Sequence, residues 1–155
     1  MFRITLRPIM ITVLCAVAGM PFAEGTAAAA TPADPVQLAA CDFGRQFATF
    51  DWSGYDDYVT RVLNLSTGPF HDQFAASAND RRAQVTATHS RSEANSVECR
   101  TEPADPAHPQ ISVTVDRSLR SDATLGLPKP QKSTMRVYLD QVAGHWLTSR
   151  VDNPI

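Results

Sequence analysis

The sequence lacks most of the motifs by which common functional classes are recognised. It has no Gly-x-Ser-x-Gly elbow and no Walker or Rossmann glycine loop, so it offers no motif of a serine hydrolase or a nucleotide-binding enzyme. It also lacks an excess of basic charge, because 14 Lys and Arg residues stand against 16 Asp and Glu residues. Arg81-Arg82 is the only adjacent basic pair, whereas proteins that hold nucleic acid usually carry a continuous basic face. We therefore expect no nucleic-acid partner.

A long apolar run is absent as well. Arg3 and Arg7 precede an uncharged stretch whose apolar centre, residues 9–20, has the size of a signal-peptide core. A membrane-spanning helix needs about 20 apolar residues, and this stretch is shorter and ends at Pro21. The alanines at 27–30 supply the small residues that signal peptidase requires. These features predict export, with an uncleaved, short membrane anchor as the alternative.

The domain organisation follows from this division. Residues 1–30 are predicted to be the signal peptide or anchor, and residues 31–155 to form one domain, which is an ordinary domain size. The expected location is extracytoplasmic, either secreted or associated with the cell envelope. With 43% hydrophobic residues the chain can build a core.

Cysteine is scarce, and one of the three cysteines lies in the predicted signal peptide. The other two, Cys41 and Cys99, would sit in an oxidising compartment, where two cysteines usually form a disulfide. Two unrelated buried thiols are the alternative. A zinc site fits poorly, since no His/Cys cluster at ligand spacing accompanies the pair. We predict a Cys41–Cys99 disulfide.

The first half of the mature chain has the three- to four-residue apolar period of helices. A first helix begins at Asp34-Pro35 and runs for about four turns. A second begins at Ser53, which has capping-box spacing to Asp56, and a third contains Phe70 and Phe74 and ends at Asn79-Asp80. Three helices are thus predicted before residue 81.

From Ala83 onward the apolar period changes to two, which is typical of strands. Strands are predicted around residues 85–87, 97–100, 111–115, 135–139 and 145–151, the last two forming a hairpin about Ala143-Gly144. The loops are expected at residues 103–109 and 121–132. Helices followed by an antiparallel sheet with one wet face predict an α+β domain, whose helices pack on one face of a curved sheet.

Candidate catalytic and metal-binding residues are few. The histidines are His71, His89, His108 and His145. None has a partner at metal-ligand spacing, so no metal or cofactor is expected. A buried Asp beside a Tyr could abstract a proton, but Asp116, Asp140 and Tyr138 lie on the strand face opposite the apolar one. We therefore expect no catalytic residues and no enzymatic activity.

The aromatic residues carry the remaining functional alternative. A curved sheet over helices can leave a pocket, and pockets of this kind bind small apolar ligands. The possible lining residues are Trp52, Tyr55, Tyr58, Phe70, Phe74 and Trp146. Core packing is the ordinary role of such residues, so both interpretations stay open at this point.

A set of short motifs resembles a known family. The motifs are Thr49-Phe50-Asp51-Trp52, Arg61-Val62-Leu63, Thr67-Gly68-Pro69-Phe70 with Phe74, and Gly144-His145-Trp146-Leu147. Together they resemble the Mce-associated (mammalian cell entry associated) proteins of actinobacteria, over roughly residues 35–151. The resemblance implies an NTF2-like, or cystatin-like, cone. It also implies a non-enzymatic accessory role in the cell envelope, supporting through protein contacts an Mce-type complex that imports lipids or sterols.

Overall fold

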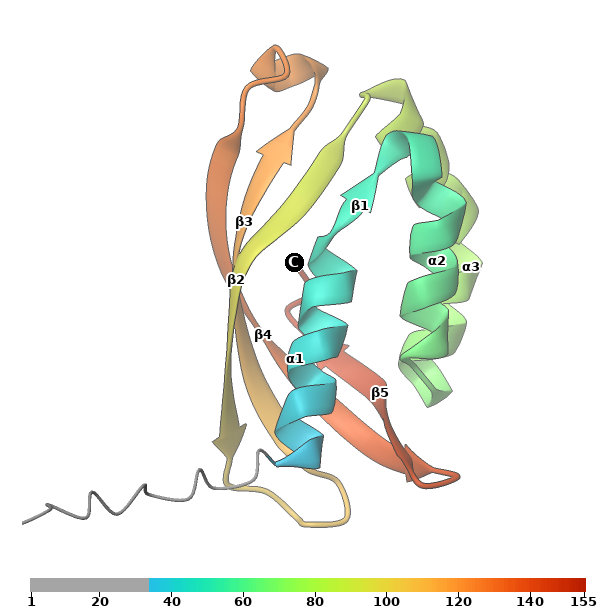
Figure 1. Ribbon diagram of the computed structural model, residues 1–155. Coiled ribbons are helices and arrows are strands. Elements are labelled where there is room, and N and C mark those ends of the chain that lie inside the picture. Colours follow the sequence, from blue (N-terminus) through green and yellow to red (C-terminus); the bar gives the residue numbers. More distant parts are fainter. Residues whose placement is uncertain (1–33) are drawn as a thin grey trace, which may run out of the picture. The chain divides into compact units, whose positions relative to one another are not determined.

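A computed structural model describes residues 34–155, which form three helices and a five-stranded sheet (Figure 1). The predicted signal peptide, residues 1–30, lies outside the described residues. The helices are α1 (Pro35–Ala48), α2 (Tyr55–Asn64) and α3 (Gly68–Ala87). The strands are β1 (Phe50–Asp51), β2 (Arg91–Glu102), β3 (Gln110–Arg120), β4 (Lys129–Val142) and β5 (His145–Asp152).

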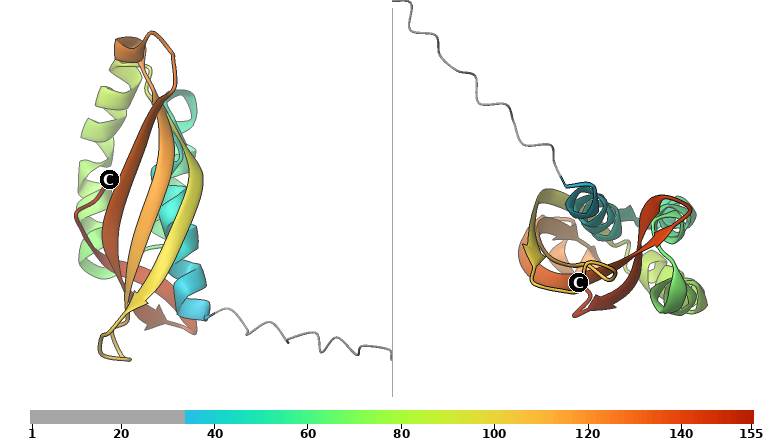
Figure 2. Two further views of the ribbon diagram at one scale, coloured as in Figure 1. Left: turned by 90° about the vertical axis from the view of Figure 1, so that its left-hand side faces the viewer. Right: turned by 90° about the horizontal axis from the view of Figure 1, so that it is seen from below.

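The sheet is an antiparallel meander in the order β1-β2-β3-β4-β5. It curls around α1, while α2 and α3 lie side by side beyond α1 (Figures 1 and 2). The expected α+β arrangement, with the N-terminal helices on one face of a curved antiparallel sheet, is confirmed.

Helix α1 begins where the sequence predicts. The side chain of Asp34 accepts a hydrogen bond from the backbone N–H of Val36 at 3.0 Å, and Pro35 occupies the first turn, where its missing N–H costs nothing. Phe43 and Phe47 are buried on the face that meets the sheet. One face of α1 therefore supplies two aromatic side chains to the core.

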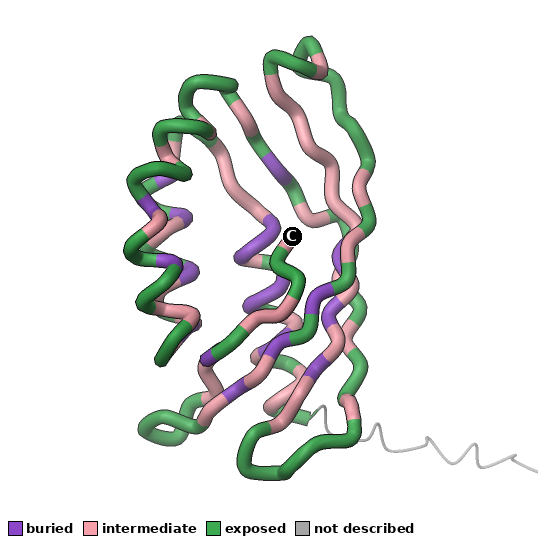
Figure 3. The backbone as a smooth tube through the Cα atoms, turned by 180° about the vertical axis from the view of Figure 1, so that it is seen from behind, coloured by how far each residue is buried: buried purple, intermediate pink, exposed green. Residues whose placement is uncertain are grey.

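The sheet's contribution to the core comes from alternate residues of its two central strands. These inward residues are Ile111, Val113, Val115, Met135, Val137 and Leu139, all fully buried. Figure 3 shows buried positions on α1, on the part of the sheet that faces it, and on α2 and α3. The apolar residues predicted at alternate positions of these two strands are thus the ones that point into the core.

Two β-bulges bend the sheet, one in β2 between Ala94 and Ser96 and one in β4–β5 beside Leu139. In β2, Ser92 and Ala94 precede the bulge and face the interior, whereas Val97 and Cys99 do so after it. The extra residue therefore changes which residues of β2 point inward, from the even-numbered ones before the bulge to the odd-numbered ones after it. It is this change that turns Cys99 toward α1.

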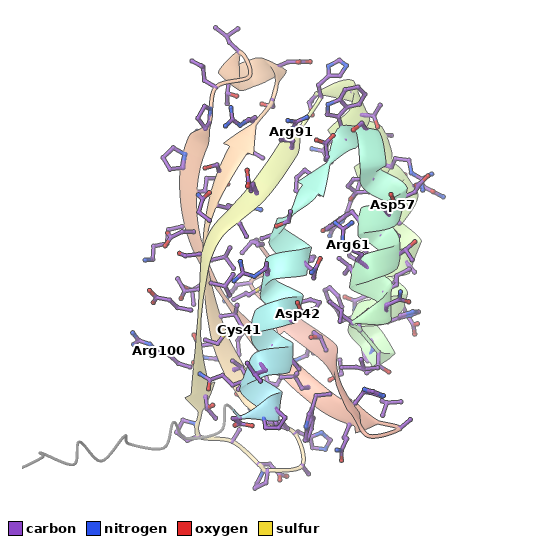
Figure 4. All side chains as sticks on the ribbon, in the orientation of Figure 1. Cys41, Asp42, Asp57, Arg61, Arg91 and Arg100 are labelled. Atoms are coloured by element: carbon purple, nitrogen blue, oxygen red, sulfur yellow. A yellow bond between two sulfur atoms is a disulfide. The ribbon has the colours of Figure 1, made fainter. Side chains whose placement is uncertain are left out.

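The predicted disulfide between Cys41 and Cys99 is present and joins α1 to β2. The two Cα atoms are 5.9 Å apart. Next to the bond, the side-chain amide of Gln37 donates a hydrogen bond to the carbonyl oxygen of Cys99 at 2.6 Å. Figure 4 shows Cys41 on the part of α1 that runs along β2. The helix is thus attached to the sheet both covalently and by hydrogen bonding.

The end predicted for the third helix is wrong, because α3 continues through Asn79-Asp80 to Ala87. The residues around Val85, predicted to be a strand, therefore belong to this helix. Asn79 and Asp80 are exposed, so they cost the helix little. Arg82 forms an ion pair with Asp56 of α2, which holds the second half of α3 against the helical layer.

Two further boundaries differ from expectation. The loop predicted for residues 121–132 ends earlier, since β4 begins at Lys129 and Pro130 pairs with Ser118. Proline is tolerated there because β5 pairs only with residues 136–142, which leaves β4 with a single neighbour at Pro130. Ser53 does not cap α2; it lies in a 3₁₀ turn, Trp52–Gly54, that Asp51 caps through the backbone N–H of Ser53 at 2.9 Å.

Gly44 marks a close approach of α1 to the sheet. A Cβ atom added to Gly44 would lie 2.6 Å from Cγ1 of Val113 and 3.4 Å from Cε of Met135. We expect Gly44→Ala to lower the free energy of unfolding by about 1–2 kcal/mol, because the overpacking exceeds the gain in helix propensity. Urea unfolding of the variant tests this. A rise of about 1 kcal/mol, as at an open helix position, would contradict the close approach.

Candidate functional site

A pocket of about 470 Å³ lies between the second half of α3 and the second half of β3. This volume falls in the range of about 300–1,000 Å³ that small-molecule sites occupy. Its apolar lining consists of Phe47, Phe50, Val85, Leu119 and Ile155. Its polar lining consists of Tyr55, Tyr58, Arg81, Gln84, Thr88, Ser90 and Arg117. Side chains of all three helices and of β3 thus meet at one site.

The pocket follows from the different lengths of α1 and β3. Ile111, Val113 and Val115 are fully buried where α1 packs on the sheet. Two residues further along the same face comes Arg117, and then Leu119, but α1 ends at Ala48. The inward face of β3 therefore continues beyond the helix that covers it, and its last two inward residues line the pocket.

The charged side chains of the pocket are all positive. Arg117 and Arg81 line it, and no Asp or Glu side chain does among the described residues. The Nε atom of Arg117 is buried and has no hydrogen-bond partner within residues 34–155. Burial lowers the pKa of the Arg117 guanidinium from its ordinary value, but arginine keeps its charge in proteins. The site therefore holds a partly buried cation that forms no ion pair within residues 34–155.

The two tyrosines of the pocket are neutral hydrogen-bonding groups. The Tyr58 hydroxyl donates to the backbone carbonyl of Phe47 at 3.1 Å. Burial raises the pKa of Tyr58, and of Tyr55, above the ordinary value of a tyrosine. Both side chains thus keep their protons at neutral pH and can act as donors.

The structure divides the six aromatic residues predicted as possible cavity lining. Tyr55 and Tyr58 line the pocket. Phe74 is buried in the core, with its ring 5.9 Å from that of Tyr58, and Phe70 stacks on Phe74 at 5.8 Å. The two phenylalanines therefore support the pocket from behind without lining it.

The two tryptophans lie elsewhere. Trp52 is 36% exposed and has its ring edge-on to His89 at a centroid distance of 4.8 Å. Trp146 is partly buried on β5 and packs on the edge of the core, but no ring contact joins it to the helix aromatics among the described residues. Neither lines the 470 Å³ pocket.

The sequence-based search missed Arg117 and Arg81, although a pattern in the sequence points to the first. Arg117 lies at an alternate position of its strand, on the same face as the apolar Ile111, Val113 and Val115. Leu119 is the next residue on that face. A charged residue on the apolar side of a strand is unusual and marks a place where the core gives way to a site. Arg81 carries no such signal, because helix α3 has no clear apolar face at that point.

A second hollow, of about 410 Å³, adjoins β1, and Figure 4 shows Asp57, Arg61 and Arg91 around it. Its charged side chains are of both signs. Arg91 forms an ion pair with Asp51 at 2.8 Å, and Arg61 donates to the side chain of Gln46 at 3.1 Å. Asp57 and Glu93 also line this hollow, so a ligand there would meet charges of both signs.

Two of the histidines form surface pairs with aspartates. The Nδ1 atom of His89 lies 2.9 Å from a carboxylate oxygen of Asp122, and that of His108 lies 3.1 Å from Asp140. Within residues 34–155 no group of three His, Cys, Asp or Glu side chains could hold a metal ion. None of the helices in this range is long and apolar enough to cross a membrane.

Comparison with known proteins finds related structures but no related sequences. No family model matches the chain, and no curated protein matches it. CagV, a VirB8 homologue of the T4SS from Helicobacter pylori strain 26695, superposes with a TM-score of 0.57 at 11% identity, over 76% of this chain and 94% of its own. VirB8 from Agrobacterium tumefaciens gives a TM-score of 0.53 at 16% identity, and the match covers 76% of this chain and 88% of VirB8. The periplasmic domain of DotI gives a TM-score of 0.54 at 12% identity, and the match covers 76% of this chain and 91% of the DotI domain.

These likenesses define the fold. Each solved structure is matched over most of its own length, so the similarity covers a whole domain and not a shared motif. The chain has the NTF2-like α+β fold of VirB8-type domains, in which helices pack against a curled antiparallel sheet of five strands.

Proposed function

We propose that this protein is an exported accessory domain of the cell envelope that acts by contacting other envelope proteins. The observation that carries the proposal is the fold, since structures of this fold include a VirB8 homologue of a secretion system and the periplasmic domain of DotI. The Cys41–Cys99 disulfide adds support, because disulfides persist mainly outside the cytoplasm. The N-terminal basic and apolar segment is also what an exported chain needs.

The proposed role is non-enzymatic. The two aspartates considered for proton abstraction, Asp116 and Asp140, do not line the pocket. Asp116 accepts a hydrogen bond from Ser96 at 3.1 Å and lies 3.5 Å from Lys132, and Asp140 pairs with His108. These carboxylates are engaged on the outer surface, so no general base faces the pocket from their strands.

The more specific form of the proposal comes from the sequence resemblance. We infer that the complex supported is of the Mce type, and that the protein aids the assembly or stability of a lipid or sterol importer. The residues that carry the resemblance lie in β1 and the 3₁₀ turn after it, in α2, at the start of α3, and at the start of β5 with the turn before it.

Crosslinking in intact cells tests the proposed function. A tagged full-length chain is expressed, the envelope is crosslinked and solubilised, and captured proteins are identified by mass spectrometry. We expect permease or substrate-binding subunits of one Mce-type transporter, at levels well above those captured by an unrelated exported domain with the same tag. Capture of secretion-channel subunits instead would overturn the Mce assignment, and a protein recovered without envelope partners would overturn the accessory role.

The pocket favours a second function, which we propose alongside the first: binding of a small ligand with a substantial apolar part. The supporting observation is the apolar half of the lining, contributed by Phe47, Phe50 and Leu119 among others. A role in contacts between proteins does not need this volume.

A further inference from the structure

We propose that the 470 Å³ pocket binds an amphipathic anion, with Arg117 holding a carboxylate or phosphate head and the aromatic lining holding an apolar body. This inference rests on the second function proposed above and names the chemical class of its ligand. It goes beyond the apolar ligand considered from the sequence, because the pocket combines an apolar lining with unpaired positive charge.

The position of Arg117 is the first step. A guanidinium on the inward face of β3 costs solvation free energy, and its Nε atom is buried without a partner among the described residues. An aliphatic residue would continue the pattern of Val113 and Val115 at no such cost. A ligand that supplies a hydrogen-bond acceptor and a negative charge would offset the cost.

The second step concerns the other polar groups of the pocket. The Tyr58 hydroxyl is used by the carbonyl of Phe47, and the hydroxyl groups of Thr88 and Ser90 bond to each other at 2.7 Å. Most hydroxyl groups are therefore satisfied within the protein. The donors that remain for a ligand are the Tyr55 hydroxyl, the Gln84 amide and the guanidinium groups of Arg81 and Arg117. Of these, the Nε atom of Arg117 is buried without a partner among the described residues.

The third step is the charge balance. Arg81 adds a second cation at the rim, its guanidinium lying 5.6 Å from the centre of the Phe74 ring. No Asp or Glu side chain lines the pocket within residues 34–155, and Asp116, the sequence neighbour of Arg117, bonds to Ser96 and Lys132. Two positive charges in a hollow with apolar walls attract anions and repel cations.

The fourth step is the match of shapes. The planar guanidinium binds a carboxylate or phosphate through two parallel hydrogen bonds. Around it, Phe47, Phe50, Val85 and Leu119 provide the apolar surface that an alkyl or aromatic body would bury. A neutral lipid would leave Arg117 without an anionic partner. A simple inorganic anion would leave the apolar lining of the pocket exposed to water.

Isothermal titration calorimetry of the purified, delipidated full chain tests the inference. Four probes share one alkyl length: laurate, dodecyl phosphate, 1-dodecanol and dodecylammonium, each kept below its micelle concentration. We expect at least one of the two anions to bind at least tenfold more tightly than dodecanol, and dodecylammonium to bind more weakly than dodecanol. The better of the two anions identifies the head group, and acetate and inorganic phosphate are expected to show no binding at the same concentrations.

Two variants locate the head group. Arg117→Gln should weaken binding of the preferred anion at least tenfold and leave dodecanol unchanged. The matched control is Arg100→Gln, because Arg100 is exposed on β2 and points away from the helices in Figure 4. Thermal unfolding of both variants verifies that they remain folded. If Arg117→Gln does not fold, protection of Arg117 from an arginine-specific reagent by the preferred anion replaces it, and absence of protection overturns the assignment.

The outcomes separate the inference from the function on which it rests. Equal affinity for dodecanol and both anions would overturn the charge selectivity while keeping a ligand-binding pocket. Binding of acetate or phosphate as tightly as the alkyl anions would overturn the amphipathic part. Absence of binding by every probe would overturn both the ligand class and the second proposed function.

Discussion

Removing the Cys41–Cys99 disulfide is expected to lower the free energy of unfolding by about 4 kcal/mol. The bond joins residues that are 58 positions apart, and in the chain-entropy model a loop of this length restricts the unfolded chain by about that amount. Small domains have a total stability of about 5–15 kcal/mol, so the loss is a large share. Denaturant unfolding of Cys41→Ala/Cys99→Ala, compared with the oxidised protein, measures it.

The two single variants sharpen this test. Either Cys41→Ala or Cys99→Ala breaks the same bond, so each should lose about as much stability as the double variant. Reduction of the unsubstituted protein should have the same effect. If the losses of the single variants instead add up to that of the double variant, the side chains would be acting through separate packing contacts, and the covalent link would not be the source of stability.

The parts of the fold that could be predicted are those in which one physical constraint dominates. In residues 111–115 of β3 and 135–139 of β4, alternate residues are fully buried and those between them are partly or fully exposed. A period of two of this kind is typical of strands. Cys41 and Cys99 were the only cysteines left in the predicted mature chain, which made their pairing predictable once export was inferred. Local pattern and compartment were enough for these elements.

The end of α3 could not be predicted in this way. Around Val85 the sequence alternates apolar and polar residues, which suits a strand, yet the segment is helical and mostly exposed. What holds it is the ion pair of Arg82 with Asp56 of α2 and the packing of Val85 against the core. Both contacts are tertiary and leave no periodic trace in the sequence.

The candidate site shows the same limit. Tyr55 and Tyr58 were predicted as lining because aromatic residues on a helix under a curved sheet point inward. Trp52 was placed with them, but the 3₁₀ turn before α2 leaves it beside His89. The arginines were missed because their importance depends on where α1 ends relative to β3, which is a property of packing.

The core under α1 is the second place where a large effect is expected. Phe43 is fully buried, its ring stacks on Phe47 at 5.4 Å, and Phe70 meets it edge-on at 5.3 Å. Phe43→Ala removes these contacts and leaves a cavity, so the free energy of unfolding should fall by about 3–5 kcal/mol. Leu38→Ala on the same helix is the control, because Leu38 is 56% exposed and its truncation should cost less than about 0.5 kcal/mol.

The same pair of variants distinguishes the core from the pocket. Phe43 lies behind Phe47 and does not line the pocket, whereas Phe47 does. Under conditions in which Phe43→Ala remains folded, its preference for an alkyl anion over dodecanol should therefore match that of the unsubstituted protein. A loss of that preference with stability intact would mean that Phe43 shapes the ligand site directly, and the separation of a core beneath α1 from a pocket beyond its end would be wrong.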